Sequence, residues 1–300
     1  MSGASRRSRN RAVLATTALA AICASAGLPI TPASGRDATA TVVRAVRGLA
    51  YRVVDGQTLR LDAYLPTATG PMRPAVVIVH GGGWRSGTRA TFAPGEASVK
   101  PTASLFAAQG WATFSIDYRL APAALFPAQL SDVQAALTWI RRQHVRYHID
   151  PRRVALLGAS AGGNVAVLAA LTAQPGTAPT AVVSWSGPME LASFYTALAT
   201  SSSRPFVADY LGCVPATCPG RYQDASPLNH ITASSPPTLL ANGTREIVPL
   251  QQARDMAAAL KAKHVPHSLI ILPGSRHAAE YEAAVIDPTI SFLASRLDHR

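Results

Sequence analysis

From residue 41 onward, short apolar segments alternate with stretches of helical periodicity, and this alternation constrains the fold more than any other feature. Strand-like segments recur at 41–47, 50–54, 58–64, 75–79, 111–116, 153–157, 180–185, 237–241 and 268–272. Several of them, such as Val76-Val77-Ile78-Val79 and Leu269-Ile270-Ile271-Leu272, are apolar at every position. Uninterrupted runs of this kind are typical of strands that are buried on both faces of a parallel sheet.

Helix-like stretches separate the later strands, near 102–109, 130–146, 161–173, 249–263 and 278–297. Between Leu130 and Ile140 the apolar residues recur every three or four positions, which gives one buried stripe. We therefore predict an α/β fold with a doubly wound, mostly parallel sheet. The first strands have no helices between them and should form an antiparallel N-terminal edge. The alternation stops at 187–235, which we interpret as a small cap-like insertion after the sixth strand.

The first 26 residues have the three-part layout of a secretory signal. Residues 1–11 carry four arginines and no acid, residues 12–24 are mostly small and apolar, and Ala24-Ser25-Ala26 offers a cleavage site. We predict a signal peptide at 1–26, a flexible leader at 27–40 and a folded domain at 41–300, exported to the periplasm, the cell envelope or the medium. Arg6-Arg7 leaves twin-arginine export open, and an uncleaved anchor helix or lipid modification of Cys23 are the alternatives.

The cysteine count agrees with export. The chain has three cysteines, and removal of Cys23 with the signal leaves the close pair Cys213 and Cys218. In an oxidising compartment such a pair closes a small loop, so we predict a disulfide. A metal site would need further ligands nearby, and residues 211–218 supply none. We expect neither a metal nor a cofactor.

The composition excludes other classes of protein. Hydrophobic residues make up 48% of the chain, too many for a disordered protein. The net charge of +12 raises the question of nucleic-acid binding, and the densest basic patch consists of Arg141, Arg142, Arg146, Arg152 and Arg153. Its first three members fall at the end of a predicted helix, where cations complement the helix dipole. No nucleic-acid motif accompanies the patch, and removal of residues 1–26 lowers the charge to +8. We expect no nucleic-acid partner and, after residue 26, no membrane span.

A Gly-x-Ser-x-Gly sequence stands between a predicted strand and a predicted helix. Gly158-Ala159-Ser160-Ala161-Gly162 follows the strand at 153–157 and precedes the helix at 161–173. A sharp turn that exposes a serine needs small neighbours, because its backbone is strained and closely packed. The helix N-terminus also directs free N–H groups to this point. Ser160 is the predicted nucleophile. The alternatives are a glycine-rich turn with an incidental serine and a phosphate loop, which lacks its Gly-Lys-Ser/Thr ending here.

A second glycine-rich turn, His80-Gly81-Gly82-Gly83-Trp84, follows the strand at 75–79. Its glycines let backbone N–H groups approach a ligand with no side chain in the way. Since sites in open α/β sheets lie at the carboxyl ends of the strands, this turn and Ser160 should lie together. The glycine N–H groups and that of Ala161 would then form an oxyanion hole. The alternative is a flexible turn without a chemical role.

A serine nucleophile needs a base and an acid that orients the base. Among the eight histidines, His277 follows the strand at 268–272 and lies at the same sheet edge as Ser160. We interpret His80 as structural, and expect the others at the opposite edge, in the insertion or at the terminus. Glu246 is the only carboxylate in the loop after the strand at 237–241, and Asp255 lies well inside the next helix. We predict His277 as the base and Glu246 as the acid. The alternative is a solvated Glu246 and an incomplete triad.

Together these motifs resemble the α/β-hydrolase superfamily, and most closely the secreted bacterial carboxylesterases and lipases of the hormone-sensitive-lipase-like and feruloyl/acetyl-esterase-like branches. The resemblance covers about residues 45–297 and also rests on Asp117-Tyr118-Arg119-Leu120-Ala121-Pro122, Phe126-Pro127, Asp132 and Gly274-Ser275-Arg276-His277. It implies an α/β-hydrolase fold, an oxyanion hole made by Gly82, Gly83 and Ala161, and a structural role for Asp117, Tyr118, Arg119 and Asp132 around the site.

The resemblance also implies a serine carboxylic-ester hydrolase that forms an acyl-enzyme. The chain lacks a large lid-like addition, so we expect short- to medium-chain esters, with Trp84 and the insertion beside the substrate. One departure concerns the acid, because similar enzymes usually have Asp there and a loop one residue longer before Pro249. We hypothesise that the Glu246 side chain, which is longer than that of Asp, compensates for the shorter loop. Amide hydrolysis by the same residues, as in arylformamidases, and a catalytically silent binding protein remain alternatives. The oligomeric state is left open.

Overall fold

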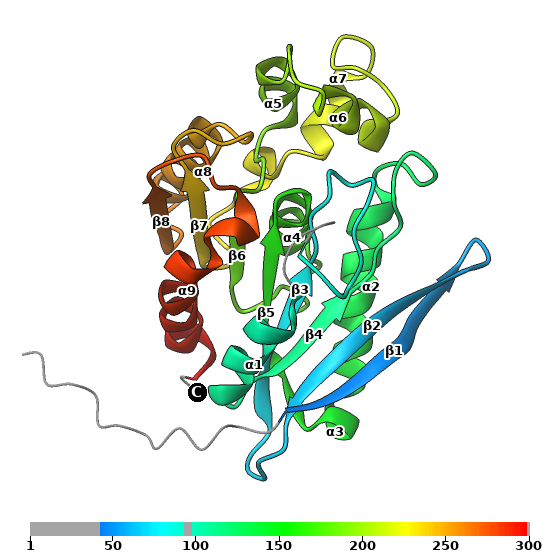
Figure 1. Cartoon of the computed structure of the whole chain (residues 1–300), viewed down its shortest axis with the longest axis vertical. Helices are drawn as coiled ribbons and strands as arrows, with labels where there is room; N and C mark the ends of the chain where they lie inside the picture. The colour runs from blue at the N-terminus through cyan, green and yellow to red at the C-terminus, as the bar shows by residue number, and fades with distance from the viewer. Residues whose placement is uncertain (1–42, 93–97, 299–300) are drawn as a thin grey trace, which may run out of the picture. The chain divides into compact units, whose positions relative to one another are not determined.

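The computed structural model describes residues 43–92 and 98–298. The predicted signal peptide at 1–26 with Cys23, the leader at 27–40 and His299 lie outside these residues. In the described part, eight strands form one sheet in the order β1-β2-β4-β3-β5-β6-β7-β8 (Figure 1). No helix in the described part is both long and apolar enough to cross a bilayer.

The strands are mostly parallel. They are β1 (Val43–Val54), β2 (Gln57–Pro66), β3 (Arg73–Val79), β4 (Ala112–Ile116), β5 (Ile149–Ala159), β6 (Val182–Trp185), β7 (Thr238–Gly243) and β8 (His267–Leu272). Strand β1 pairs antiparallel with β2, and β2 antiparallel with β4, whereas the other neighbours are parallel. The predicted parallel sheet with an antiparallel N-terminal edge is confirmed.

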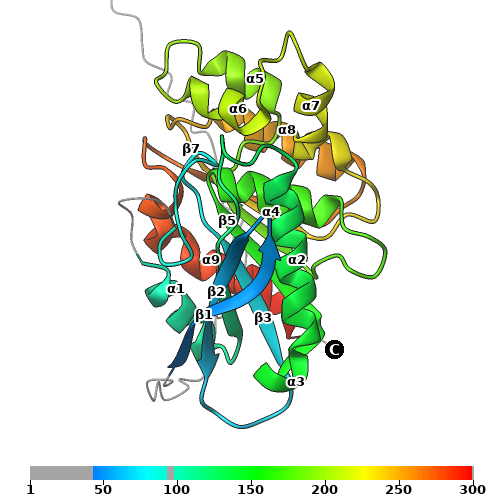
Figure 2. The ribbon, with the colours of Figure 1, turned by 90° about the vertical axis from the view of Figure 1, so that its right-hand side faces the viewer.

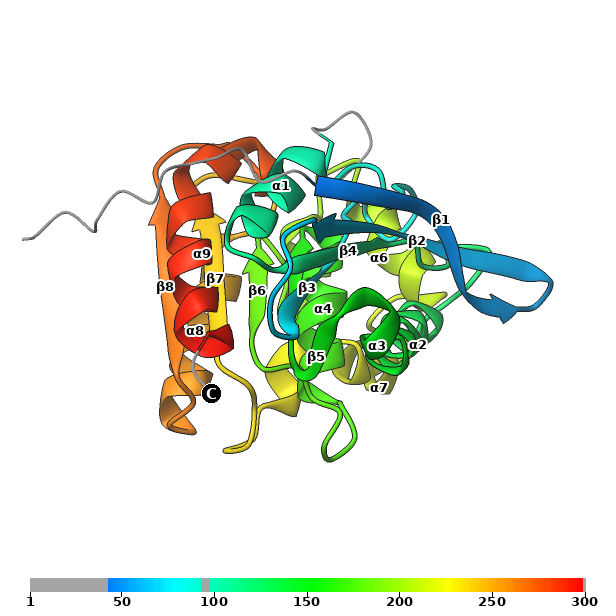
Figure 3. The same cartoon turned by 90° about the horizontal axis from the view of Figure 1, so that it is seen from below.

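Helices cover both faces of the sheet (Figure 3). Helices α2 (Ala128–Arg142), α4 (Ala161–Leu171) and α8 (Leu250–Ala262) pack on one face, and α1 (Lys100–Ala108) and α9 (Glu282–Leu297) on the other. Successive strand residues alternate between the two cores: Val77 belongs to the first, and Val76 and Ile78 to the second. Because both faces are covered, both sets of side chains on such a strand are buried, which favours apolar residues at successive positions.

The segment 187–235 is helical and contains α5 (Leu191–Ala197), α6 (Arg204–Leu211), α7 (Pro219–Asp224) and the 3-10 turn η1 (Pro227–His230). Helices α5, α6 and α7 lie beyond the carboxyl ends of the parallel strands (Figures 1 and 2). Phe194, Tyr210 and Tyr222 are buried in the same core cluster as α2 and α4. The insertion therefore covers one edge of the sheet and shares its core.

The structure differs from the prediction in its element boundaries. The segments predicted as two strands, 41–47 and 50–54, form the single strand β1, because Gly48 makes a bulge where a break was expected. Gly48 has a φ of +68° and donates its N–H to the Asp62 carboxylate at 2.8 Å, after which pairing resumes. The helix predicted at 130–146 is divided into α2 and α3 (His144–Tyr147). The one predicted at 278–297 begins with the 3-10 turn η2 (Ala278–Tyr281).

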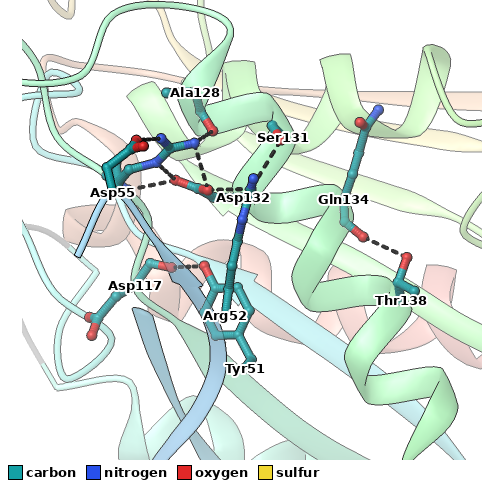
Figure 4. Close-up of polar contacts among 10 residues, drawn as sticks. Tyr51, Arg52, Asp55, Asp117, Ala128, Ser131, Asp132, Gln134 and Thr138 are labelled. Carbon is teal, nitrogen blue, oxygen red and sulfur yellow. Dashed lines mark hydrogen bonds and ion pairs between the residues drawn. The ribbon is translucent and has the colours of Figure 1, made fainter. Parts of the chain in front are cut away.

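An ionic cluster ties the N-terminal edge to helix α2 (Figure 4). The fully buried Asp132 carboxylate accepts from Arg52 at 2.6 Å and from Arg119 Nε at 2.9 Å. Arg119 also pairs with the exposed Asp55 at 2.9 Å. We call Arg52, Arg119 and Asp132 the Asp132 cluster. It joins β1, the loop after β4 and α2, in agreement with the structural role expected for Arg119 and Asp132.

Candidate active site

Ser160 stands at the turn between β5 and α4, in a backbone conformation that few L-residues adopt (φ 53°, ψ −123°). A Cβ on Gly158 would lie 2.2 Å from the Gly162 carbonyl oxygen, and a Cβ on Gly162 would lie 2.2 Å from that of Val79. Neither position has room for a side chain. The Gly-x-Ser-x-Gly spacing thus follows from the packing of the turn on itself and on β3.

Three residues from separate loops meet at this turn. His277 Nε2 lies 2.8 Å from Ser160 Oγ, and His277 Nδ1 contacts Glu246 Oε2. The Glu246 side chain is fully buried, and that of His277 is 20% exposed. Ser160 follows β5, Glu246 follows β7 and His277 follows β8. The structure therefore brings together the predicted nucleophile, base and acid in the order of a catalytic triad. The Glu246 side chain reaches His277 from the shorter loop.

Two residues behind the carboxylate were missed by the sequence reasoning. Glu246 Oε1 accepts from the Gly243 N–H and lies 2.8 Å from the Ser186 hydroxyl. Ser186 Oγ in turn lies 2.6 Å from the Tyr281 hydroxyl and accepts from the Ala278 N–H at 3.0 Å. No local motif marks Ser186 or Tyr281, because the contact between them joins residues 95 positions apart.

The glycine-rich turn lies directly beside Ser160. A Cβ on Gly81 would lie 3.2 Å from the Ser160 Cβ, so the two turns are in contact. Gly82 and Gly83 have φ values of +99° and +60°, which favour glycine. None of the hydrogen bonds found in the described part of the chain uses the backbone N–H of Gly82, Gly83 or Ala161. These residues line the same cavity as Ser160, and their unused N–H groups are the donors that an oxyanion hole requires.

His80 supports this turn from the interior. Its ring stacks on Tyr118 at a centroid distance of 4.2 Å, and the Tyr118 hydroxyl donates to the His80 carbonyl oxygen at 2.9 Å. Complete burial lowers the pKa of His80 to about 4, against the opposing effects of the Gly81 carbonyl and Asp117. The ring is therefore neutral at pH 7. Asp117, directly after β4, accepts from the Arg89 guanidinium at 2.6 Å. This ion pair anchors the loop that follows the glycine-rich turn.

Helix α6 of the insertion contacts the last two residues of the turn and the residue that follows it. A Cβ on Gly83 would lie 2.5 Å from the Phe206 ring, Trp84 stacks on Tyr210 at 4.6 Å, and Arg85 pairs with Asp209 at 3.1 Å. Positions 206, 209 and 210 share one helix face. Trp84, predicted beside the substrate, is buried and contributes to the cavity wall.

A cavity of about 310 Å³ opens between the two turns and the insertion. Ser160, His277, Gly82, Gly83 and Ala161 form its polar side. Its remaining walls are mainly apolar and include Phe194, Leu198, Phe206, Val207 and Val248. The arrangement suits an apolar substrate whose reacting carbonyl reaches Ser160.

The two cysteines of the insertion lie at adjoining helix ends. Cys213 follows α6 and Cys218 precedes α7, with their Cα atoms 6.2 Å apart, within the range that a disulfide spans. Within residues 43–92 and 98–298, no group of three or more His, Cys, Asp and Glu side chains is arranged to hold a metal ion.

Comparison with known proteins places the chain in a family. Residues 61–260 match the BD-FAE family. The chain belongs to the BD-FAE family. Among curated relatives, Esterase LipC of Mycobacterium tuberculosis (strain ATCC 25618 / H37Rv) is 32% identical to the BD-FAE chain over 240 residues, covering 74% of this chain and 57% of the relative. The BD-FAE chain spans about half the length of this relative and of the similar Mycobacterium tuberculosis proteins LipM and LipQ.

Solved structures show the fold of this BD-FAE protein. A truncated form of a carbohydrate esterase from gut microbiota has a TM-score of 0.74 at 22% identity, covering 87% of this chain and 99% of that one. Esterase 2 of Thermogutta terrifontis, phosphonylated by sarin, has a TM-score of 0.68 at 21% identity, covering 87% and 98%. The fold is that of the α/β hydrolases, and the relatives place the chain in the hormone-sensitive-lipase-like branch, as predicted.

Proposed function

We propose that this BD-FAE protein is a serine hydrolase of carboxylic esters. The observation that carries the proposal is the hydrogen-bonded series Ser160, His277 and Glu246 beside a cavity. The names of the relatives, which include Esterase LipC and Probable carboxylic ester hydrolase LipM of Mycobacterium tuberculosis, support esters as the substrate class.

The proposed reaction proceeds through an acyl-enzyme. Ser160 Oγ attacks the ester carbonyl while His277 Nε2 takes the serine proton, and His277 then returns this proton to the leaving alcohol. The N–H groups of Gly82, Gly83 and Ala161 stabilise the oxyanion of the tetrahedral intermediate. Water, deprotonated by His277, releases the acid from Ser160. Glu246 keeps the proton on Nδ1 and stabilises the imidazolium form.

The proposed substrates are esters with short to medium acyl chains. The cavity of about 310 Å³ has mainly apolar walls, and the buried Trp84 is one of its lining residues. Phe194 of α5 and Leu198 at its C-cap also line it. A chain that outgrows this volume has to leave through the mouth, where it gains less burial of apolar surface.

We also propose that the protein is exported after cleavage near Ala26 and that Cys213 and Cys218 form a disulfide in the mature chain. The adjacent positions of the two cysteines support the pairing. Mass spectrometry of the secreted protein tests both points, since the mature chain should begin at Gly27 and have no free thiol before reduction.

The decisive experiment compares the wild-type protein with Ser160→Ala on a short p-nitrophenyl ester and with a fluorophosphonate probe. We expect the wild type to hydrolyse the ester and to be labelled, and the variant to do neither, because both reactions need the serine nucleophile. Turnover retained by a folded Ser160→Ala variant would refute the proposal. Faster turnover of formyl-kynurenine than of simple esters would instead favour amide hydrolysis by the same residues.

A further inference from the structure

Next to the candidate triad, the hydroxyl groups of Ser186 and Tyr281 connect Glu246 with the turn that follows His277. The series runs from Glu246 Oε1 to Ser186 Oγ at 2.8 Å and from Ser186 Oγ to the Tyr281 hydroxyl at 2.6 Å. Both side chains are buried, with exposures of 0% for Ser186 and 1% for Tyr281. We propose that Ser186 and Tyr281 are positioning residues that hold the Glu246 carboxylate in register with His277. The proposal rests on the proposed function.

The protons of the two hydroxyl groups have one favourable arrangement. The Ser186 hydroxyl donates its single proton to the Glu246 carboxylate, so only Tyr281 can place a proton in the 2.6 Å contact between the two hydroxyl oxygens. The Ala241 carbonyl competes for the Tyr281 proton at a longer distance of 2.9 Å, and it also accepts from the Ser186 N–H at 2.8 Å. With the shorter contact preferred, Tyr281 donates to Ser186 Oγ and Ser186 donates to the carboxylate. In this arrangement both O–H groups point towards the negative charge, and each polarises the next. Burial raises the pKa of Tyr281 far above its usual range, so its proton stays in place.

The two oxygens of Glu246 have separate partners. Oε1 accepts from the Gly243 N–H and from Ser186, whereas Oε2 faces His277 Nδ1. Two donors on Oε1 fix the rotation of the carboxylate, so that Oε2 stays directed at the base. A Glu side chain has one more rotatable bond than Asp, and it needs this restraint more.

The same serine also holds the base. Ser186 Oγ accepts from the N–H of Ala278, the residue after His277, at 3.0 Å. Its backbone sits at a φ of +55°, an uncommon conformation for a residue with a side chain. Next to it, the Trp185 carbonyl accepts from the Ser160 N–H at 2.7 Å. The short segment Trp185-Ser186 at the end of β6 therefore contacts the Glu246 carboxylate directly, and it contacts Ser160 and the residue after His277 through their backbone N–H groups.

The test is a double-mutant cycle with Ser186→Ala, Tyr281→Phe and the two combined, measured as kcat and KM on a p-nitrophenyl ester. We expect Ser186→Ala to lower kcat about 10- to 100-fold, the effect of one hydrogen bond to a charged acceptor, with KM unchanged. Tyr281→Phe should lower kcat about 3- to 10-fold. In the Ser186→Ala background Tyr281→Phe should have no further effect, because Tyr281 acts through Ser186. The rate of fluorophosphonate labelling should fall in parallel with kcat.

Matched controls remove a buried hydroxyl elsewhere. Ser184→Ala, on β6, and Tyr147→Phe each delete a buried hydroxyl that has no hydrogen-bond partner among the described residues, and both should keep the wild-type kcat. A wild-type kcat in both Ser186→Ala and Tyr281→Phe overturns the proposal. It is also overturned if the two losses of kcat multiply in the double variant, or if the substitutions change only KM or only the midpoint of thermal unfolding.

If Ser186→Ala does not fold, Tyr281→Phe decides alone. A lower kcat with unchanged KM and unchanged unfolding midpoint supports the proposal, and an unchanged kcat overturns it. A wild type that neither hydrolyses an ester nor takes the label overturns the proposed function and this proposal with it. An active wild type with unaffected variants overturns this proposal only.

Discussion

Asp132 and Glu246 are both fully buried carboxylates, and their surroundings differ in kind. Asp132 lies between two guanidinium groups, Arg52 at 2.6 Å and Arg119 at 2.9 Å. Glu246 has no Lys or Arg partner among the described residues. Its donors are the Gly243 N–H, the Ser186 hydroxyl and His277.

The difference separates two uses of a buried negative charge. Around Asp132 the charge is neutralised permanently, so the group can only hold β1, α2 and the loop after β4 together. Around Glu246 the charge is held in place by neutral donors and left without a permanent cation. In the proposed mechanism, the imidazolium formed on His277 would be its counter-ion, which is the condition for stabilising that transient charge.

The largest effect is expected from Glu246→Gln. The Gln amide would donate to His277 Nδ1 and leave Nε2 protonated, unable to accept the Ser160 proton. We expect kcat on a short ester to fall about 10³- to 10⁴-fold, with the midpoint of thermal unfolding nearly unchanged. Asp255→Asn, on the exposed face of α8, is the matched control and should keep wild-type activity. Activity of Glu246→Gln near that of the wild type would exclude Glu246 as the triad acid.

The opposite result is expected from Asp132→Ala. This change leaves Arg52 and Arg119 largely buried without their shared counter-ion, so it should lower the free energy of unfolding by about 3–5 kcal/mol. At temperatures where the variant is folded, kcat per folded molecule should stay near the wild-type value. Urea unfolding measures the first quantity. Asp55→Ala removes only the exposed partner of Arg119 and should lower the free energy of unfolding by less than about 1 kcal/mol. An equal loss in the two variants would contradict the structural role of the buried Asp132.

A third buried group, His80, extends the comparison to a side chain kept neutral. Its pKa of about 4 in the folded protein lies below the value of 6.5 of an unperturbed histidine. The unfolded chain therefore binds a proton between these pH values that the folded one does not, and stability is lost as pH falls through this window. We expect a loss of about 3 kcal/mol between pH 7 and pH 4 from this group. His80→Asn should show a correspondingly flatter dependence, and identical pH profiles of unfolding free energy would contradict it.

The sheet and the meeting of Ser160, Glu246 and His277 at one of its edges were predictable because each depends on local pattern. A strand buried on both faces is mostly apolar, and the uninterrupted run Val76–Val79 indicates such a strand without any knowledge of its neighbours. Glu246 and His277 follow from their positions just after apolar strands, since carboxyl ends of parallel strands meet at one edge. The bulge at Gly48 was not predictable in this way, because it depends on the Asp62 carboxylate from the next strand.

Ser186 and Tyr281 show where such reasoning ends. Ser186 stands in Trp185-Ser186-Gly187-Pro188, which has the composition of an ordinary turn, and Tyr281 stands at the start of a helical pattern. Their contact depends on how the end of β6 and the turn η2 pack together in three dimensions. A serine hydroxyl in a turn is usually satisfied by its own backbone, and nothing in the local sequence indicates that this one faces a carboxylate.

The contacts of α6 with Gly83, Trp84 and Arg85 have a consequence for changing substrate preference by design. A segment transplanted from a related protein in place of 187–235 would remove the ring on Gly83, the stack on Trp84 and the partner of Arg85 at once. Phe194 and Leu198 line the cavity from α5 and its C-cap, and neither is part of these three contacts. Libraries for new acyl groups should therefore vary α5 and retain Phe206, Asp209 and Tyr210.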